Sequence, residues 1–148
     1  MSSTYLGLHF HIVFATKHRQ PLIDVEWRSR LHEYLGGTVN GLGGVSERVG
    51  GVADHVHLLV SLRSTHCLAD VLRELKKASS EWVHTEIQQS DFAWQVGYAA
   101  FTVGPRDRGG VSSYIDHQEE HHRTRSSRDE LLEMLALAEI DYDPRYFE

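Results

Sequence analysis

The chain has 148 residues, 41% of them hydrophobic, which is enough apolar surface for one compact domain over residues 1–148. No apolar run approaches the roughly 20 residues that span a bilayer, and the N-terminus lacks a basic stretch followed by an apolar one. We therefore expect a cytoplasmic protein without a membrane partner. The single cysteine, Cys67, excludes an internal disulfide.

The formal net charge of −6 is located at the C-terminal end. Residues 116–148 hold four arginines against ten acidic residues, so residues 1–115 are electrically balanced. That balanced part carries small basic groups suited to the phosphates of a short, structured DNA end. The candidates for these contacts are Lys17, Arg19, Arg73, Lys76 and Lys77. For Lys76 and Lys77, an ordinary solvated helix face is an equally good interpretation.

The first half of the chain predicts a strand, a helix and a hairpin. Alternating apolar side chains indicate the first strand, and Pro21 suits the start of a helix whose apolar residues recur at helical spacing. A glycine pair at 50–51 is typical of a turn between two strands. The expected elements are a strand at 5–16, a helix at 22–39 and a strand hairpin at 45–52 and 54–61.

The second half predicts a helix, a strand and two further helices. They are a helix at 67–88, a strand at 95–103, a helix that carries Tyr114, and a last helix at 129–140 capped by Ser126 or Ser127. The order β-α-β-β-α-β followed by two helices predicts an α+β fold. We expect a ferredoxin-like antiparallel sheet with helices mainly on one face, plus two C-terminal helices.

Two histidines alternate within the predicted strand 54–60, which reads DHVHLLV. Strand side chains alternate between faces, so His55 and His57 point the same way with Cα atoms about 6.5 to 7 Å apart. Two ring nitrogens at that separation can bind one divalent cation. The simplest alternative is a pair of hydrogen-bonded histidines on a half-buried strand, because short motifs also arise by chance. His9 and His11 form a second alternating pair, which would line the same face if the two strands are neighbours.

A polar segment follows the breaker-rich residues 104–110 and is compatible with a helix. On a helix, Tyr114 and Gln118 stand at i and i+4, about 6 Å apart on one face. A phenol and a carboxamide would then approach a strand-borne metal together. A half-buried amphipathic tyrosine and a solvated glutamine are the more ordinary interpretation.

Four blocks occur in order along the chain: HIVFATKHR at 11–19, DHVHLLV at 54–60, FAWQVGYAAFTV at 92–103 and YIDHQEEHH at 114–122. Together they resemble the small HUH-type single-tyrosine transposases of bacterial insertion sequences that move as single-stranded DNA, and their REP-associated relatives. The resemblance runs from about residue 5 to the C-terminus. Four ordered blocks are far more specific than any one of them.

The resemblance implies a role for each residue that matches the family pattern. Tyr114 would be the nucleophile that forms a 5′-phosphotyrosine and leaves a free 3′-hydroxyl. His55 and His57 would be metal ligands, because the pair His9 and His11 lacks the flanking residues of the family block. Gln118 would be the third ligand. The remaining histidines of the helix, His117, His121 and His122, are not carried over and are expected to be partly exposed.

The family also implies the same core fold, single-stranded DNA with hairpins as the partner, and a homodimer in which the tyrosine helix can serve the partner's histidine pair. Two neutral imidazoles and one carboxamide oxygen leave positions open for phosphate oxygen and water. That donor set suits an octahedral Mg²⁺ or Mn²⁺.

The leading hypothesis is therefore a metal-assisted DNA transposase that cleaves and rejoins single-stranded DNA at hairpin-marked element ends. One alternative is a catalytically silent or domesticated protein that binds single strands or hairpins. The other is a metal-dependent phosphoesterase that works without a covalent step.

Overall fold

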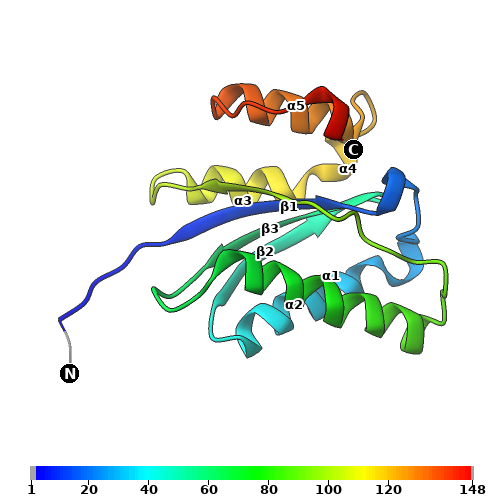
Figure 1. The fold of residues 1–148 in the computed structure, drawn as a ribbon, viewed down its shortest axis with the longest axis horizontal. Helices are drawn as coiled ribbons and strands as arrows, with labels where there is room; N and C mark the ends of the chain where they lie inside the picture. Colours follow the sequence, from blue (N-terminus) through cyan, green and yellow to red (C-terminus); the bar gives the residue numbers. More distant parts are fainter. Residues whose placement is uncertain (1–2, 148) are drawn as a thin grey trace.

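A four-stranded antiparallel sheet forms the centre of the molecule (Figure 1). The computed structural model describes residues 3–147. The strands are β1 (His9–Ala15), β2 (Val45–Gly51), β3 (His55–Ser61) and β4 (Ala99–Thr102), and their spatial order is β2-β3-β1-β4. This arrangement confirms the predicted ferredoxin-like sheet and places β1 and β3, the two histidine-bearing strands, side by side in the middle.

Helices cover both faces of the sheet (Figure 1). Helices α1 (Val25–Gly41) and α2 (Leu68–Trp82) lie on one face. The opposite face carries α3 (Arg108–Asp116), α4 (Gln118–His121) and α5 (Ser127–Leu137). A final short helix, η3 (Pro144–Tyr146), precedes the C-terminal end. Among residues 3–147, no helix combines the length and the apolar character needed to cross a bilayer.

The alternation of β3 divides its side chains between two environments. Val56, Leu58 and Val60 belong to the main core between the sheet and α1 and α2. The other face of the strand carries His55, His57 and Leu59, and Leu59 packs against Ile115 of α3 in a smaller core. Because both faces are covered, residues 55–60 of the strand are buried, although two of the three side chains named on the second face are histidines.

Two strands are shorter than the sequence predicted. The first was expected at 5–16, but only His9–Ala15 pair in the sheet. The last was expected at 95–103, but β4 begins at Ala99. Gln95 explains the second difference, since its side-chain oxygen accepts a hydrogen bond of 2.7 Å from the backbone N–H of Ala15. A side chain thus takes the place of a strand partner there, and Val96 beyond it is 93% exposed.

Local capping sets the helix boundaries. Asp24 Oδ1 accepts a hydrogen bond of 3.0 Å from the N–H of Glu26, so α1 begins at Val25 and not at residue 22. Ser126, one of the two predicted caps, accepts a bond from the N–H of Asp129 and starts α5. The helix predicted at 67–88 ends as α-helix at Trp82 and continues as one wider π-helical turn, η2 (Val83–Ile87).

Candidate active site

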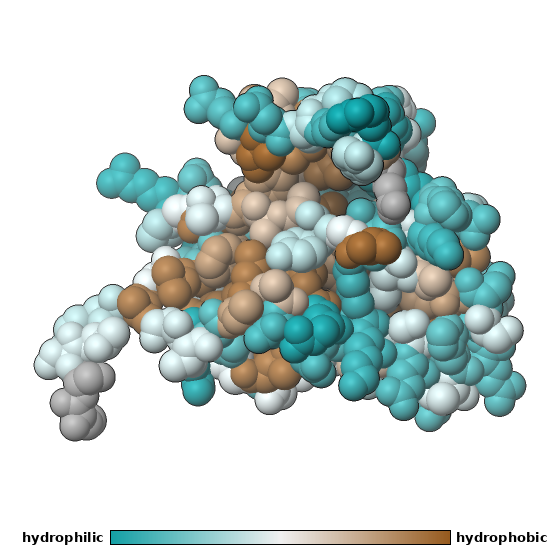
Figure 2. Space-filling view, viewed as in Figure 1, coloured by the Kyte–Doolittle hydropathy of each residue, from teal (hydrophilic) through white to brown (hydrophobic). Residues whose placement is uncertain are grey.

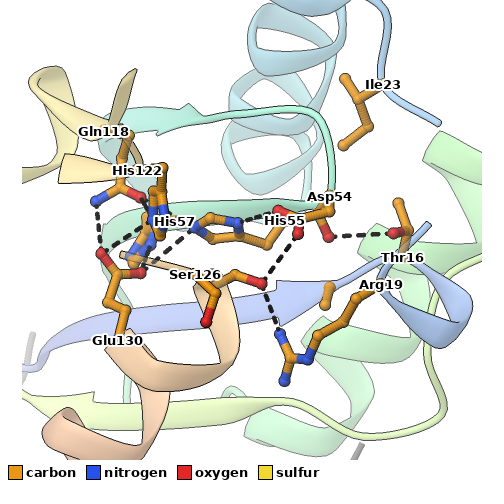
Figure 3. Close-up of polar contacts among 12 residues, drawn as sticks. Thr16, Arg19, Ile23, Asp54, His55, His57, Gln118, His122, Ser126 and Glu130 are labelled. Carbon is orange, nitrogen blue, oxygen red and sulfur yellow. Dashed lines mark hydrogen bonds and ion pairs between the residues drawn. The ribbon is translucent and has the colours of Figure 1, made fainter. Parts of the chain in front are cut away.

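The side chains of His55 and His57 lie together beneath the C-terminal helices (Figure 3). Both are buried, with exposed fractions of 1% and 0%, and their ring centroids are 4.9 Å apart. The predicted alternation therefore places both imidazoles on the sheet face that α3, α4 and α5 cover. The two residues form the floor of the candidate site.

A hydrogen bond at Nδ1 orients each of these rings. His55 Nδ1 lies 2.7 Å from Asp54 Oδ1, and Asp54 Oδ2 in turn accepts a bond of 3.0 Å from the hydroxyl of Ser127. His57 Nδ1 lies 2.8 Å from His11 Nε2 on the neighbouring strand β1. Both Nε2 atoms are thereby directed toward the helices, which is how outer hydrogen bonds fix metal-binding histidines. The sequence predicted that His11 would line this face if the two strands were neighbours, and in the structure it lies there and bonds to His57.

Gln118 approaches the same histidines, although the helix that carries it differs from the prediction. Its Oε1 lies 2.9 Å from His55 Nε2, and its side chain is 1% exposed. The expected continuous helix from Tyr114 to Gln118 is wrong: α3 ends at Asp116, and His117 is non-helical with φ −107° and ψ 26°. The N–H of His117 bonds to the carbonyl of Tyr114, so a tight turn redirects the chain before α4 begins at Gln118.

Tyr114 lies against the histidine cluster within the same chain. Its ring centroid is 5.9 Å from that of His57, and its ring stacks on His121 at 4.5 Å. The hydroxyl donates a hydrogen bond to Glu130 Oε2. Burial, and then the bond to the Glu130 carboxylate, raise the pKa of Tyr114 above its usual value. The tyrosine is therefore a protonated phenol at rest.

The missing side chain of Gly50 determines how closely α3 approaches the sheet. Gly50 pairs with His57 in the β2–β3 ladder, and a Cβ at this position would lie 2.6 Å from the carbonyl oxygen of Ile115. That carbonyl belongs to the residue that follows Tyr114. Only glycine lets the tyrosine helix lie this close to the histidine strand.

We predict that Gly50→Ala lowers the free energy of unfolding by about 1–3 kcal/mol, because the added methyl group must push α3 away from β2. Chemical denaturation measures this directly. Gly109→Ala is the matched control: it lies on α3 with nothing within 4 Å of an added Cβ, so it should leave stability unchanged or raise it. Equal stability of Gly50→Ala and the wild type would contradict this close packing.

Burial and hydrogen bonding give the two histidines different protonation states at neutral pH. Burial lowers the pKa of His57 to about 4, so this ring is neutral. Burial acts in the same direction on His55, but hydrogen bonds to Asp54 and Glu130 outweigh it and raise the pKa to about 9. Burial also opposes the charge of Glu130, yet hydrogen bonds with His122, His55 and His57 hold its pKa below the usual range. A protonated His55 therefore lies beside the Glu130 carboxylate.

The sequence profile of the IS200-like transposases matches residues 4–118, a stretch that contains His55, His57, Tyr114 and Gln118. The chain belongs to this family. It is 27% identical over 119 residues to the ISDra2 transposase TnpA of Deinococcus radiodurans, which covers 75% of this chain and 84% of that protein.

Two solved structures share the fold of this IS200-like transposase. A candidate transposase from Deinococcus radiodurans R1 superposes with a TM-score of 0.63 and 23% identity, over 80% of this chain and 96% of that chain. A REP-associated tyrosine transposase bound to a REP hairpin superposes with a TM-score of 0.60 and 13% identity, over 82% and 74% respectively.

Two residues that the structure places in the site, Glu130 and His122, were not assigned to it from the sequence. Glu130 of α5 is 1% exposed, and its carboxylate lies among His55, His57 and Gln118. His122, expected to be partly exposed and without a role, directs Nε2 to within 3.0 Å of Gln118 Oε1. The i and i+4 spacing of Gln118 and His122 was an available signal for the second. Glu130 lies beyond the matched residues 4–118, and only its place among the leucines of an amphipathic helix hinted at burial.

The first basic pair expected to contact DNA, Lys17 and Arg19, lies in the turn that follows β1, one of the two histidine-bearing strands. Lys17 is exposed in a short 3-10 turn, η1 (Lys17–Arg19), directly after β1. Arg19 Nη1 donates to Ser127 Oγ at 3.2 Å, and Ser127 also bonds to Asp54. Arg19 is therefore linked through Ser127 and Asp54 to His55.

The second basic group, on α2, lies on the opposite face of the sheet from the histidines. Arg73 forms an ion pair with Asp70, and Lys77 is exposed. Lys76 Nζ donates to the carbonyl oxygens of residues 95, 96 and 97 at 2.9, 3.0 and 2.6 Å. Lys76 therefore holds the loop before β4, and any contact of this group with DNA would be remote from the site.

Proposed function

We propose that this transposase cleaves and rejoins single-stranded DNA through a 5′-phosphotyrosine on Tyr114, assisted by a divalent cation bound to His55, His57 and Gln118. The observation that carries the proposal is the meeting of the Tyr114 phenol with both imidazoles and the Gln118 carboxamide inside one chain. The family match supports a transposase, and the geometry supplies the groups that phosphodiester cleavage needs.

The proposed cleavage step is a transesterification. Tyr114 Oη forms a bond to phosphorus and loses its proton, while the bond from phosphorus to the 3′-oxygen breaks and that oxygen takes up a proton. The covalent product keeps the energy of the ester bond, so the reverse attack by a 3′-hydroxyl rejoins DNA without ATP. Because the phenol is protonated at rest, its proton must leave as the new bond forms.

The residues present fit a divalent cation. His55 and His57 direct Nε2 to the same place, the Gln118 oxygen joins them, and His57 is already neutral. Bound there, Mg²⁺ or Mn²⁺ would withdraw charge from the non-bridging phosphate oxygens. Protonated His55 must release its proton when it becomes a ligand, so binding of the cation is coupled to proton release.

A cleft of about 650 Å³ beside His55 offers a path for the strand. It lies between α5 and the sheet edge at β4, where apolar side chains gather on the surface (Figure 2). Arg19 and the aromatic rings of Tyr98, Tyr142 and Phe147 are among its lining residues. Cationic and aromatic side chains together are suited to single-stranded nucleic acid, because every base has a face that can stack on a ring.

Hairpin recognition and pairing of two subunits complete the proposal. A fold neighbour was solved with a REP hairpin, which supports a hairpin as the DNA partner here. The homodimer follows from the family resemblance and is measurable by sedimentation. Tyr114 reaches the histidines within one chain, so a single subunit holds every group named above. We also propose that the protein acts in the cytoplasm.

The test is incubation of the protein with a labelled single-stranded hairpin oligonucleotide and Mg²⁺ or Mn²⁺. We expect an SDS-stable adduct that keeps a label placed 3′ of the cut and loses one placed 5′ of it. Binding without an adduct would support a silent DNA-binding protein instead. Release of both fragments without an adduct would support a phosphoesterase.

A further inference from the structure

Glu130 of α5 projects a buried carboxylate into the place where the proposed metal ligands converge (Figure 3). Its Oε1 lies 3.0 Å from His57 Nε2 and 3.4 Å from His55 Nε2. Its Oε2 accepts the hydrogen bond from Tyr114. One carboxylate thus contacts both the histidine pair and the nucleophile.

His122 lies beside this carboxylate and points the same nitrogen inward. Its Nε2 is 3.2 Å from Glu130 Oε2 and 3.0 Å from Gln118 Oε1. Its Nδ1 lies 2.7 Å from the backbone carbonyl of Arg125. A carbonyl oxygen can only accept, so Nδ1 carries the hydrogen, and the Nε2 of a neutral His122 presents a lone pair to two oxygens.

The two ring nitrogens of His55 have the same kinds of partner as those of His122. Its Nδ1 bonds to the Asp54 carboxylate, which also can only accept, while its Nε2 faces Gln118 Oε1 at 2.9 Å. Two imidazoles therefore direct Nε2 at oxygen atoms after their hydrogens are committed elsewhere. One cation between these nitrogens and oxygens would be bound by all of them.

The spacing of these atoms matches a coordination sphere. Around a cation with bonds of about 2.1 Å, neighbouring octahedral ligands are about 3 Å apart. The pairs formed by Glu130 with His57, Gln118 with His55 and Gln118 with His122 measure 3.0, 2.9 and 3.0 Å. Donor atoms of His55, His122 and Glu130 all lie within 4.8 Å of one another. These separations are those expected between neighbouring ligands of one divalent cation.

We propose that Glu130 and His122 are ligands of the same divalent cation as His55, His57 and Gln118. This inference extends the proposed function and rests on its metal site. Glu130 adds a negative charge to an otherwise neutral donor set, which strengthens binding of a divalent cation. Through its second oxygen the same carboxylate holds the Tyr114 hydroxyl beside the cation, so α5 couples the position of the nucleophile to the metal.

Titration of the full-length protein with Mn²⁺, followed by the EPR signal of the free ion, tests the proposal. Glu130→Gln and His122→Gln should each weaken Mn²⁺ binding by roughly tenfold or more. Asp129→Asn is the matched control for the first, because Asp129 is an exposed carboxylate in the same first turn of α5. His117→Gln is the control for the second, because His117 is exposed and its ring Nδ1 bonds to the Ser113 carbonyl, outside the ligand cluster. Both controls should bind like the wild type.

The wild-type protein gives a second readout that does not depend on how a variant folds. Pulsed EPR of bound Mn²⁺ should show three coupled imidazole nitrogens, from His55, His57 and His122. Two nitrogens, together with unchanged affinity in Glu130→Gln, would overturn the proposal. That result leaves the covalent chemistry intact, whereas absence of any DNA adduct together with weakened Mn²⁺ binding in Glu130→Gln would reject the proposed function and keep the ligand assignment.

Discussion

Tyr114→Phe should abolish the covalent protein–DNA adduct, with a fall in rate of at least about a thousandfold, because loss of a nucleophile removes the reaction path and not only a contact. The phenylalanine ring keeps the stacking on His121 and loses only the hydroxyl that bonds to Glu130. Binding of the hairpin oligonucleotide and of Mn²⁺ should stay close to wild type. Gel separation of the adduct and a binding titration measure the two effects independently.

Tyr34→Phe is the control for this substitution. Tyr34 lies on α1, stacked on Trp82 on the far side of the sheet, so its hydroxyl should not matter for cleavage. Tyr142 and Tyr146 of the C-terminal segment line the cleft beside His55 and are the alternative nucleophiles. An adduct that survives Tyr114→Phe and disappears when one of these two is replaced would move the nucleophile from α3 to that segment.

The sheet could be predicted from sequence because its signals are local. Alternation within β3 places His55 and His57 on one face, and alternation within β1 places His9 and His11 on one face. Only the pairing of β1 with β3 shows that these two faces are the same. The start of β4 and the end of α2 were harder to predict from the sequence. β4 is shortened by a bond between Gln95 and Ala15, which are 80 residues apart in the chain, and no local pattern reports such a contact.

For the site as well, residues in local motifs could be predicted from the sequence, and a residue brought in by tertiary packing could not. His55, His57, Tyr114 and Gln118 were identified from spacing and family resemblance, and the structure brings all four together. Glu130 could not be identified in this way. A glutamate in the first turn of a helix is ordinarily solvated, and its burial here depends on the docking of α5 over the sheet face that carries the histidines.

Replacing both His55 and His57 with alanine should remove the stabilisation that Mn²⁺ gives the protein. A cation at one hundred times its dissociation constant stabilises the folded state by about 2.7 kcal/mol, and two lost imidazoles should reduce that gain to near zero. The double variant should also form no DNA adduct, and chelation should have the same effect on the wild type until Mn²⁺ is restored.

The quantity to compare in this experiment is the shift of the unfolding temperature on adding Mn²⁺, and not the unfolding temperature itself. Removing two buried rings leaves cavities and takes hydrogen-bond partners from Glu130, so the metal-free variant should already be less stable. His66→Ala is the control, because His66 bonds to Leu42 and Arg63 away from the site. It should keep the full Mn²⁺ shift. A wild-type shift in the double variant would place the cation elsewhere and separate the histidine pair from the chemistry of Tyr114.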